Sequence, residues 1–174
     1  MIEDPANCVI NTVANALRAQ FAPDSAQPPI GGGSAMVRLF AGEGLPIQAW
    51  DFHREDGCDE PFLWVRLMRR YRSENFPAPY SGGDPCPMPV VVAVEVGVAR
   101  CALVSAGDCD WECYENEAEI AMDDSWRIER ALCFAATYLR KTTCALQVGL
   151  DIIAPFGPDG GVGGWTGALF AELG

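Results

Sequence analysis

Basic residues and histidine are scarce in this sequence. Its 174 residues include 24 aspartates and glutamates but only 12 lysines and arginines, which gives a formal net charge of −12. A chain this acidic repels a phosphate backbone, so it lacks the electrostatic attraction that supplies most nucleic-acid binding. The single histidine, His53, lies among acidic residues and is a weak base for thiol or Ser-His-Asp catalysis. The composition therefore argues against a nucleic-acid-binding protein, and we expect no enzymatic activity.

Long hydrophobic runs are also missing. The longest candidate, residues 90–104, is shorter than the ~20 residues of a membrane helix and contains Glu95 and Arg100. The first four residues, Met-Ile-Glu-Asp, have neither the positive charge nor the apolar stretch of a signal peptide. Hydrophobic residues still make up 49% of the chain, as in ordinary globular proteins. We therefore expect one soluble domain, residues 1–174, that is made in the cytoplasm and does not enter a membrane.

Eight cysteines would indicate a disulfide framework in a short secreted chain, but no secretion signal is visible. In a reducing compartment cysteines are usually free and often buried, so we expect mostly free thiols. Cys109 and Cys113 are the best candidates for an exception, since both lie in a polar segment. They could also form half of a zinc site, but no second close pair of ligands accompanies them. The sequence therefore predicts no bound metal and no other cofactor.

Hydrophobic periodicity predicts two helices. Asp4-Pro5 is typical of a helix start, and apolar residues then recur at helical spacing as far as Phe21. For the second helix, Asn116 and Glu119 resemble a capping box, and an apolar stripe follows as far as Leu139. The acidic start and basic end of this second segment both suit the helix dipole.

Residues 62–72 alternate with the period of two that is typical of a β-strand. Strict alternation places Leu63, Val65, Leu67 and Tyr71 on one face and Trp64, Arg66, Met68, Arg70 and Arg72 on the other. The first face suits a hydrophobic core. The second suits solvent or a partner.

Four further segments are expected to form strands. Residues 90–104 are rich in valine and apolar on both faces, which is typical of a strand near the middle of a sheet. Residues 145–154 and 165–173 are expected to form a hairpin around a glycine-rich loop at 156–164. A short strand is expected within residues 45–52.

In chain order these elements indicate an α+β fold. A mixed or antiparallel sheet is flanked by an N-terminal helix and a long helix near residues 117–140, with a β-hairpin at the C-terminus. Two long loops rich in proline and glycine, 23–34 and 76–89, separate the elements. The glycines near the C-terminus lack the Lys-Ser/Thr that follows a phosphate-binding loop.

Four segments, together with the N-terminal amphipathic helix, carry a resemblance to a known family. They are Phe62-Leu-Trp-Val-Arg-Leu-Met-Arg-Arg-Tyr71, Val94-Glu-Val-Gly-Val-Ala-Arg-Cys101, Asp123-Asp-Ser-Trp-Arg-Ile-Glu-Arg-Ala-Leu132 and Gly164-Trp-Thr-Gly167. In this order they resemble the neck and tail-terminator proteins of long-tailed phages that infect actinobacteria. Tail terminators of the lambda type have the element order α-β-β-β-α-β.

The resemblance implies a structural virion protein of the phage neck and tail that assembles in the host cytoplasm. It implies a homo-oligomeric ring, of six subunits, that caps the tail tube. The ring would join the tube to the head-to-tail connector or stopper protein. DNA would pass through its lumen without specific binding.

For such a ring we expect the subunit interface on strand 62–72 and on the glycine-rich loop 157–164. Arginines on the polar face of the strand would pair with carboxylates of a neighbouring subunit, since a guanidinium holds a carboxylate in one bidentate geometry. Glycines allow a neighbouring backbone to approach closely. The candidate interface residues are Trp64, Arg66, Arg70, Arg72, Gly160, Gly161, Gly163 and Gly164. A solvated strand face is the alternative interpretation.

Residues 108–124 contain eight acidic residues and no basic one. In a ring, part of this set is expected to face the channel or its rim, because a negative wall lets DNA slide without holding it. The candidate lumen residues are Asp108, Asp110, Glu112, Glu115 and Glu117. The alternative is a solvated rim at a helix start.

Three other functions fit the sequence less well. A head-to-tail connector or stopper would bind a portal-proximal adaptor instead of the tail-tube protein. A thiol enzyme or hydrolase would show a single hyper-reactive cysteine. A cytosolic binding or immunity-like domain would remain monomeric.

Overall fold

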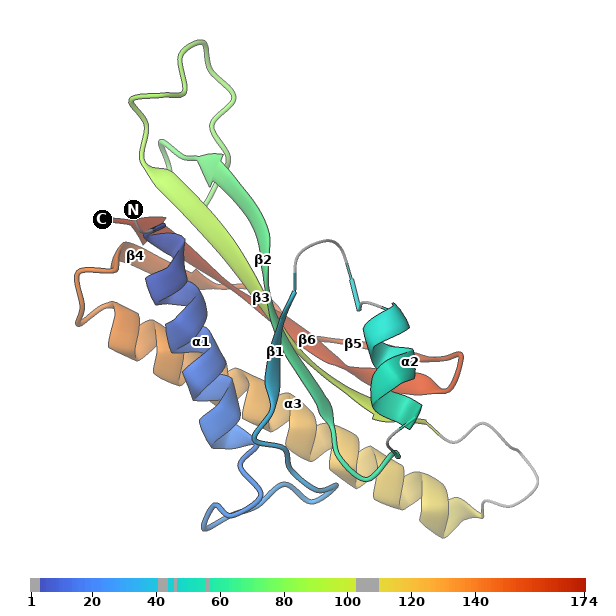
Figure 1. Ribbon diagram of the computed structural model, residues 1–174. Coiled ribbons are helices and arrows are strands. Elements are labelled where there is room, and N and C mark those ends of the chain that lie inside the picture. The colour runs from blue at the N-terminus through green and yellow to red at the C-terminus, as the bar shows by residue number, and fades with distance from the viewer. Residues whose placement is uncertain (1–3, 41–43, 46, 56, 103–109) are drawn as a thin grey trace.

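The computed structural model describes residues 4–40, 44–45, 47–55, 57–102 and 110–174. Within them the chain forms three helices and a six-stranded mixed sheet, so the expected α+β class is confirmed. The helices are α1 (Ala6–Gln20), α2 (Ile47–Glu55) and α3 (Trp111–Leu139) (Figure 1). The strands are β1 (Val37–Phe40), β2 (Phe62–Arg72), β3 (Val90–Cys101), β4 (Ala145–Leu150), β5 (Ala154–Asp159) and β6 (Val162–Leu173).

Strand β3 lies in the middle of the sheet, whose order is β1-β2-β3-β6-β4. It pairs antiparallel with β2 on one side and with β6 on the other, which explains why its residues are apolar on both faces. Strands β4 and β5 pair with different halves of β6, and β1 joins β2 in parallel. The predicted strand at 90–104 is thus confirmed as far as Cys101; residues 103 and 104 lie outside the described part.

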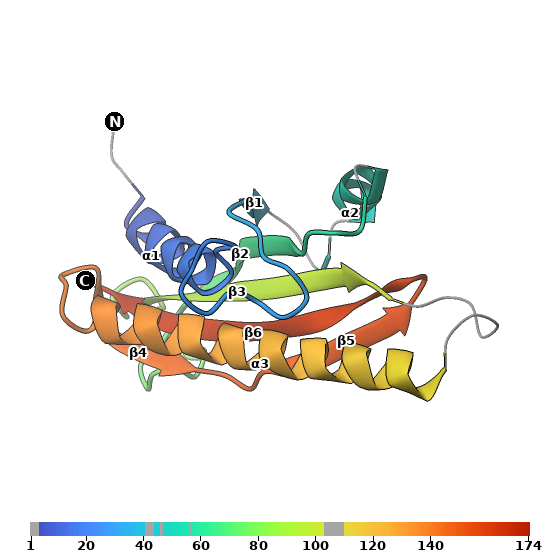
Figure 2. The ribbon, with the colours of Figure 1, turned by 90° about the horizontal axis from the view of Figure 1, so that it is seen from below.

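Helices α1 and α3 pack against each other and cover one face of the sheet (Figures 1 and 2). The main core lies between this helix pair and the sheet. Its largest fully buried side chains include Val9, Val13 and Leu17 of α1, Ile128, Leu132 and Leu139 of α3, and Leu63, Val65 and Leu169 of the sheet. Burial of each aliphatic side chain contributes about 1.5–3 kcal/mol to folding.

The opposite face of the sheet carries two smaller apolar clusters. At one end α2 places Trp50 against Phe62 and Trp64. At the other end Phe76, from the β2–β3 connection, packs with Phe170. The predicted strand at 45–52 is therefore wrong. A helix forms there because Trp50 has an aromatic cluster on the sheet against which to pack, and a nine-residue helix gains most of its stability from such contacts.

A β-bulge at Met68 reverses the alternation of β2. Leu67 pairs with Val94, and the next paired residue, Arg69, faces Ala93. An extra residue in one strand turns every later side chain to the other face. The predicted alternation therefore holds up to Met68, which packs in the Phe76 cluster, and is wrong beyond it. Tyr71 joins the Phe76 cluster, while Arg70 lies on the same face as helix α1.

The long helix α3 begins six residues before the N-terminus of the expected helix near 117. Asp110 is its N-cap, and the Asp110 carboxylate accepts a hydrogen bond from the backbone N–H of Cys113 at 3.2 Å. A capping aspartate satisfies one of the unpaired amides of the first turn. The expected capping box at Asn116 and Glu119 is therefore wrong, since both residues lie inside the helix.

The glycine-rich region near the C-terminus is mostly strand. The turn between β5 and β6 contains only Gly160 and Gly161, whose φ angles of 58° and 79° suit glycine. Gly163 and Gly164 belong to β6, and a Cβ on Gly164 would collide with the backbone oxygen of Val98. The expected loop at 156–164 is therefore wrong, because β5 pairs with β6 through this region.

The expectation of mostly free cysteines is wrong. Disulfides join Cys8 to Cys144 and Cys58 to Cys101, with Cα–Cα distances of 6.0 and 5.7 Å. Cys113 is also disulfide-bonded, whereas Cys86 and Cys133 are free and exposed. The bridged pairs are 136 and 43 residues apart, so only the folded chain brings them together. Cys109 lies outside the described residues.

Candidate interaction surfaces

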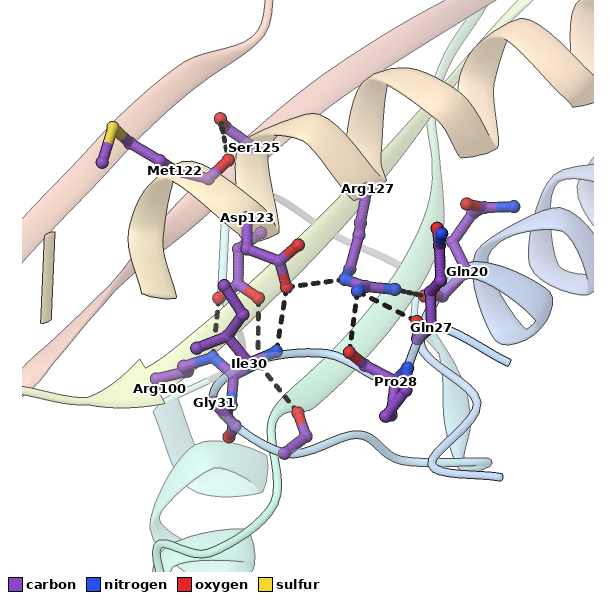
Figure 3. A network of polar contacts seen from close by, with 12 residues as sticks. Gln20, Gln27, Pro28, Ile30, Gly31, Arg100, Met122, Asp123, Ser125 and Arg127 are labelled. Atoms are coloured by element: carbon purple, nitrogen blue, oxygen red, sulfur yellow. Dashed lines mark hydrogen bonds and ion pairs between the residues drawn. The ribbon is translucent and has the colours of Figure 1, made fainter. Parts of the chain in front are cut away.

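Two arginine-aspartate pairs fasten the 23–34 loop to the body of the protein (Figure 3). Arg100 of β3 binds Asp124 of α3 through two hydrogen bonds of 2.6 and 2.8 Å, and it also donates to the carbonyl oxygens of Gly31 and Gly32. Asp124 is 2% exposed, and burial raises the pKa of its carboxyl above the usual value against the opposing effect of Arg100. The pair of Arg100 and Asp124 therefore joins strand β3, helix α3 and the 23–34 loop.

Arg127 and Asp123 form the second pair, at 2.7 Å. The Arg127 guanidinium also donates to the carbonyl oxygens of Gln20, Gln27 and Pro28, and Asp123 accepts from the backbone N–H of Ile30 (Figure 3). A planar guanidinium with several donors suits this task. The loop is thus held by contacts within its own chain.

Trp64 and Arg66, two of the expected interface residues, are buried within the chain at 1% and 7% exposure. Arg66 lies directly opposite Glu95 on β3, and its guanidinium binds both carboxylate oxygens at 2.6 and 2.9 Å. The Trp64 indole points to the same carboxylate at 3.4 Å. The argument that Arg66 needs a carboxylate from a neighbour is therefore wrong, since the adjacent strand supplies one.

Arg70 and Arg72 remain closer to the surface. Arg70 binds Asp4, just before α1, at 2.6 Å, and both side chains are more than 40% exposed. The hydrogen bond from Arg70 lowers the pKa of the Asp4 carboxyl below its usual 3.8. Arg72 donates to the carbonyl oxygen of Met88 at 2.7 Å. These two arginines, together with Gly160 and Gly161 at the hairpin tip, stay as predicted interface residues.

The acidic segment divides into two parts. Its end, Asp123 and Asp124, belongs to the ion pairs that hold the 23–34 loop. Its beginning lies on the first turns of α3, where Glu112 and Glu115 are exposed and Glu117 is half-buried. Asp110 is the exposed N-cap, and Asp108 lies outside the described residues. Only the first part is placed to meet a channel or a partner.

Helix α3 also exposes large apolar side chains on its outer surface. They are Trp111, Tyr114, Met122, Trp126, Phe134 and Tyr138. Phe134 and Tyr138 border a groove of about 1110 Å³ between α1 and the C-terminal part of α3. Asparagine and threonine side chains complete its walls, and Lys141 stands at its edge. Such walls can bind a partner through apolar and hydrogen-bonding contacts.

Within the described residues, no group of three or more histidine, cysteine, aspartate or glutamate side chains could hold a metal ion. In the same part of the chain, every helix is too short or too polar to cross a membrane.

Sequence reasoning missed the pairs of Arg66 with Glu95 and of Arg100 with Asp124. The first pair could have been found only from the register of β2 against β3. The second joins residues of a strand and a helix that no local pattern relates.

Comparison of the chain with protein-family models and with curated proteins gives no match.

Proposed function

We propose that the protein is a structural component of a phage virion, a tail terminator. In this proposal its subunits form a ring that caps the tail tube and joins it to the head connector. DNA passes through the lumen. The proposal rests on the sequence resemblance and on features of the fold that agree with it.

The observation that carries the proposal is the order of the elements. One helix, three strands, a second helix and the C-terminal strands follow one another, with α2 inserted between β1 and β2. Apart from α2 and the two additional C-terminal strands, this order agrees with the α-β-β-β-α-β order that the resemblance implies, and the two flanking helices share one face of the sheet.

The surface of the chain favours assembly over catalysis. Apolar side chains are exposed along α3, and an exposed apolar surface commonly marks a contact with another protein. A net charge of −12 per subunit, repeated around a ring, also gives a lumen that repels phosphate. The exposed Glu112 and Glu115 are the described candidates for that lumen or its rim.

Native mass spectrometry and electron microscopy of the purified chain, alone and with tail tubes, test the proposal. We expect a closed ring of about 113 kDa, six times the 18.8 kDa of one subunit, bound at one end of each tube. A chain that stays monomeric both alone and beside tail tubes contradicts it. Binding to the portal-proximal adaptor, without binding to tubes, would instead indicate a connector or stopper.

A further inference from the structure

The first half of α3 has a half-buried side, with Cys113, Glu117 and Ile120, and an exposed side. The helix begins at Trp111, but its buried residues begin only at Asp124. In Figure 2 this end of α3 lies at the margin of the molecule. A helix gains most of its stability from packing one face against other elements. The exposed side of these turns carries large apolar residues, which points to a contact outside the chain.

Five residues of this half form one stripe along the helix: Trp111, Glu115, Glu119, Met122 and Trp126. Their spacings of four, four, three and four residues keep them on one side of an α-helix. Trp111, Met122 and Trp126 are 82%, 62% and 55% exposed. We name these five residues the acidic-aromatic stripe. It lies on the side of α3 away from the buried Ile128 and Leu132.

The charges of the stripe restrict what can cover it. Glu115 and Glu119 are exposed and have no ion pair within the described residues, and Glu112 lies beside them. The first basic residue of α3, Arg127, is turned toward Asp123 and the 23–34 loop. Nucleic acid, an anionic membrane and the same stripe of a second copy are all repelled by this surface.

We propose that the acidic-aromatic stripe docks a basic amphipathic helix of another protein. The apolar side chains of that helix would cover Trp111, Met122 and Trp126. Its lysines or arginines would pair with Glu115 and Glu119 at the rim, where they govern the rate and the specificity of association. The inference uses the surface of one subunit only. If the subunits form a ring, it places Glu115 at the rim and not in the lumen.

Binding of a synthetic amphipathic helix of lysine and leucine, about 18 residues or five turns long, tests the proposal. Fluorescence anisotropy of the labelled peptide gives its dissociation constant for the intact, oxidised chain. We expect Trp126→Ala to weaken binding by about tenfold or more, as for a central aromatic residue of an interface. The double variant Glu115→Gln/Glu119→Gln should weaken binding by a similar factor and reduce its dependence on salt.

Two matched controls separate docking from general attraction to an acidic protein. Asp24→Asn/Glu74→Gln removes the same charge from exposed sites elsewhere, and Leu146→Ala removes an exposed apolar side chain of β4. Both should leave the dissociation constant unchanged within about twofold. A glutamate-leucine peptide of the same length should not bind.

Four results would overturn the proposal. They are no binding of the lysine-leucine peptide, equal weakening by the control variants, equal binding of the glutamate-leucine peptide, and no effect of Trp126→Ala in a chain that keeps its circular dichroism. Self-association of the chain alone that Trp126→Ala abolishes would also overturn it, because a second copy would then cover the stripe.

Discussion

Substitution of Arg66 should destabilise the subunit itself. In the Arg66→Ala variant Glu95 keeps its charge at a site that is only 14% exposed, next to the buried Trp64. Removing one partner of a buried ion pair costs about 3–5 kcal/mol, because the other charge stays desolvated without compensation. Since domains of ordinary size are stable by only about 5–15 kcal/mol, this loss is a large fraction of the total.

Urea denaturation, followed by tryptophan fluorescence with the disulfides intact, measures the effect. The midpoint should fall with little change in slope, since the surface exposed on unfolding stays almost the same. A second variant, Arg66→Leu/Glu95→Leu, should recover most of the stability, because apolar side chains of similar size can replace a buried pair without loss. Arg70→Ala is the matched control, since its pair with Asp4 is largely exposed and should contribute far less.

The opposite ranking would refute the reasoning. If Arg66→Ala lowers the urea midpoint no more than Arg70→Ala does, the Arg66–Glu95 pair does not hold β2 to β3 as the geometry indicates. If Arg66→Ala instead lowers only ring assembly, Arg66 is an interface residue and its burial in one subunit is misleading.

Three other predictions concern the loop, the helix start and the disulfides. Arg127→Ala should raise hydrogen exchange and protease cleavage within residues 23–34, with a loss of about 1.5–3 kcal/mol for each charged hydrogen bond that has no substitute, whereas Arg130→Ala should not. The pKa of the Asp4 carboxyl lies below 3.8, so the contribution of the pair to stability is present above pH 3.8 and is lost as the pH falls through the lowered pKa. NMR titration should show that Arg70→Ala raises this pKa toward 3.8. An unchanged pKa would contradict the pairing of Arg70 with Asp4. Cys8→Ser/Cys144→Ser should lower the free energy of unfolding by about 2–5 kcal/mol under oxidising conditions and by almost nothing after reduction, as measured by thermal denaturation.

Features that depend on local periodicity could be predicted from the sequence. Helix α1, strands β2 and β3, and the α+β class follow from apolar spacing over ten or more residues. The short elements could not be predicted in this way. Helix α2 depends on the contact of Trp50 with Phe62, and β1 is a four-residue edge strand whose pairing with β2 is its main support.

The candidate sites depended on long-range geometry, and there the sequence was less informative. Alternation in β2 assigned Arg66 and Arg70 to one face, but a single extra residue at Met68 separates them. Basic and apolar residues occur on both sides of Met68 in the sequence, so no local pattern shows the bulge. The absence of a secretion signal predicts free cysteines, but the pairing of cysteines depends on the fold. Helix α1 approaches the start of β4, and the α2–β2 connection approaches the end of β3.

These corrections move the expected contacts of the subunit from its sheet to its helices. Arg66 of β2 pairs with Glu95 of β3, and Gly164 of β6 leaves room for the neighbouring strands β3 and β5. The 23–34 loop is fixed by Arg100 and Arg127. Outside the acidic-aromatic stripe, the exposed apolar side chains Phe134 and Tyr138 of α3 instead border the groove beside α1. Arg70 lies on the same side, at the start of α1. Because burial of apolar area drives most protein association, a ring built from this subunit should use its helical side for contacts.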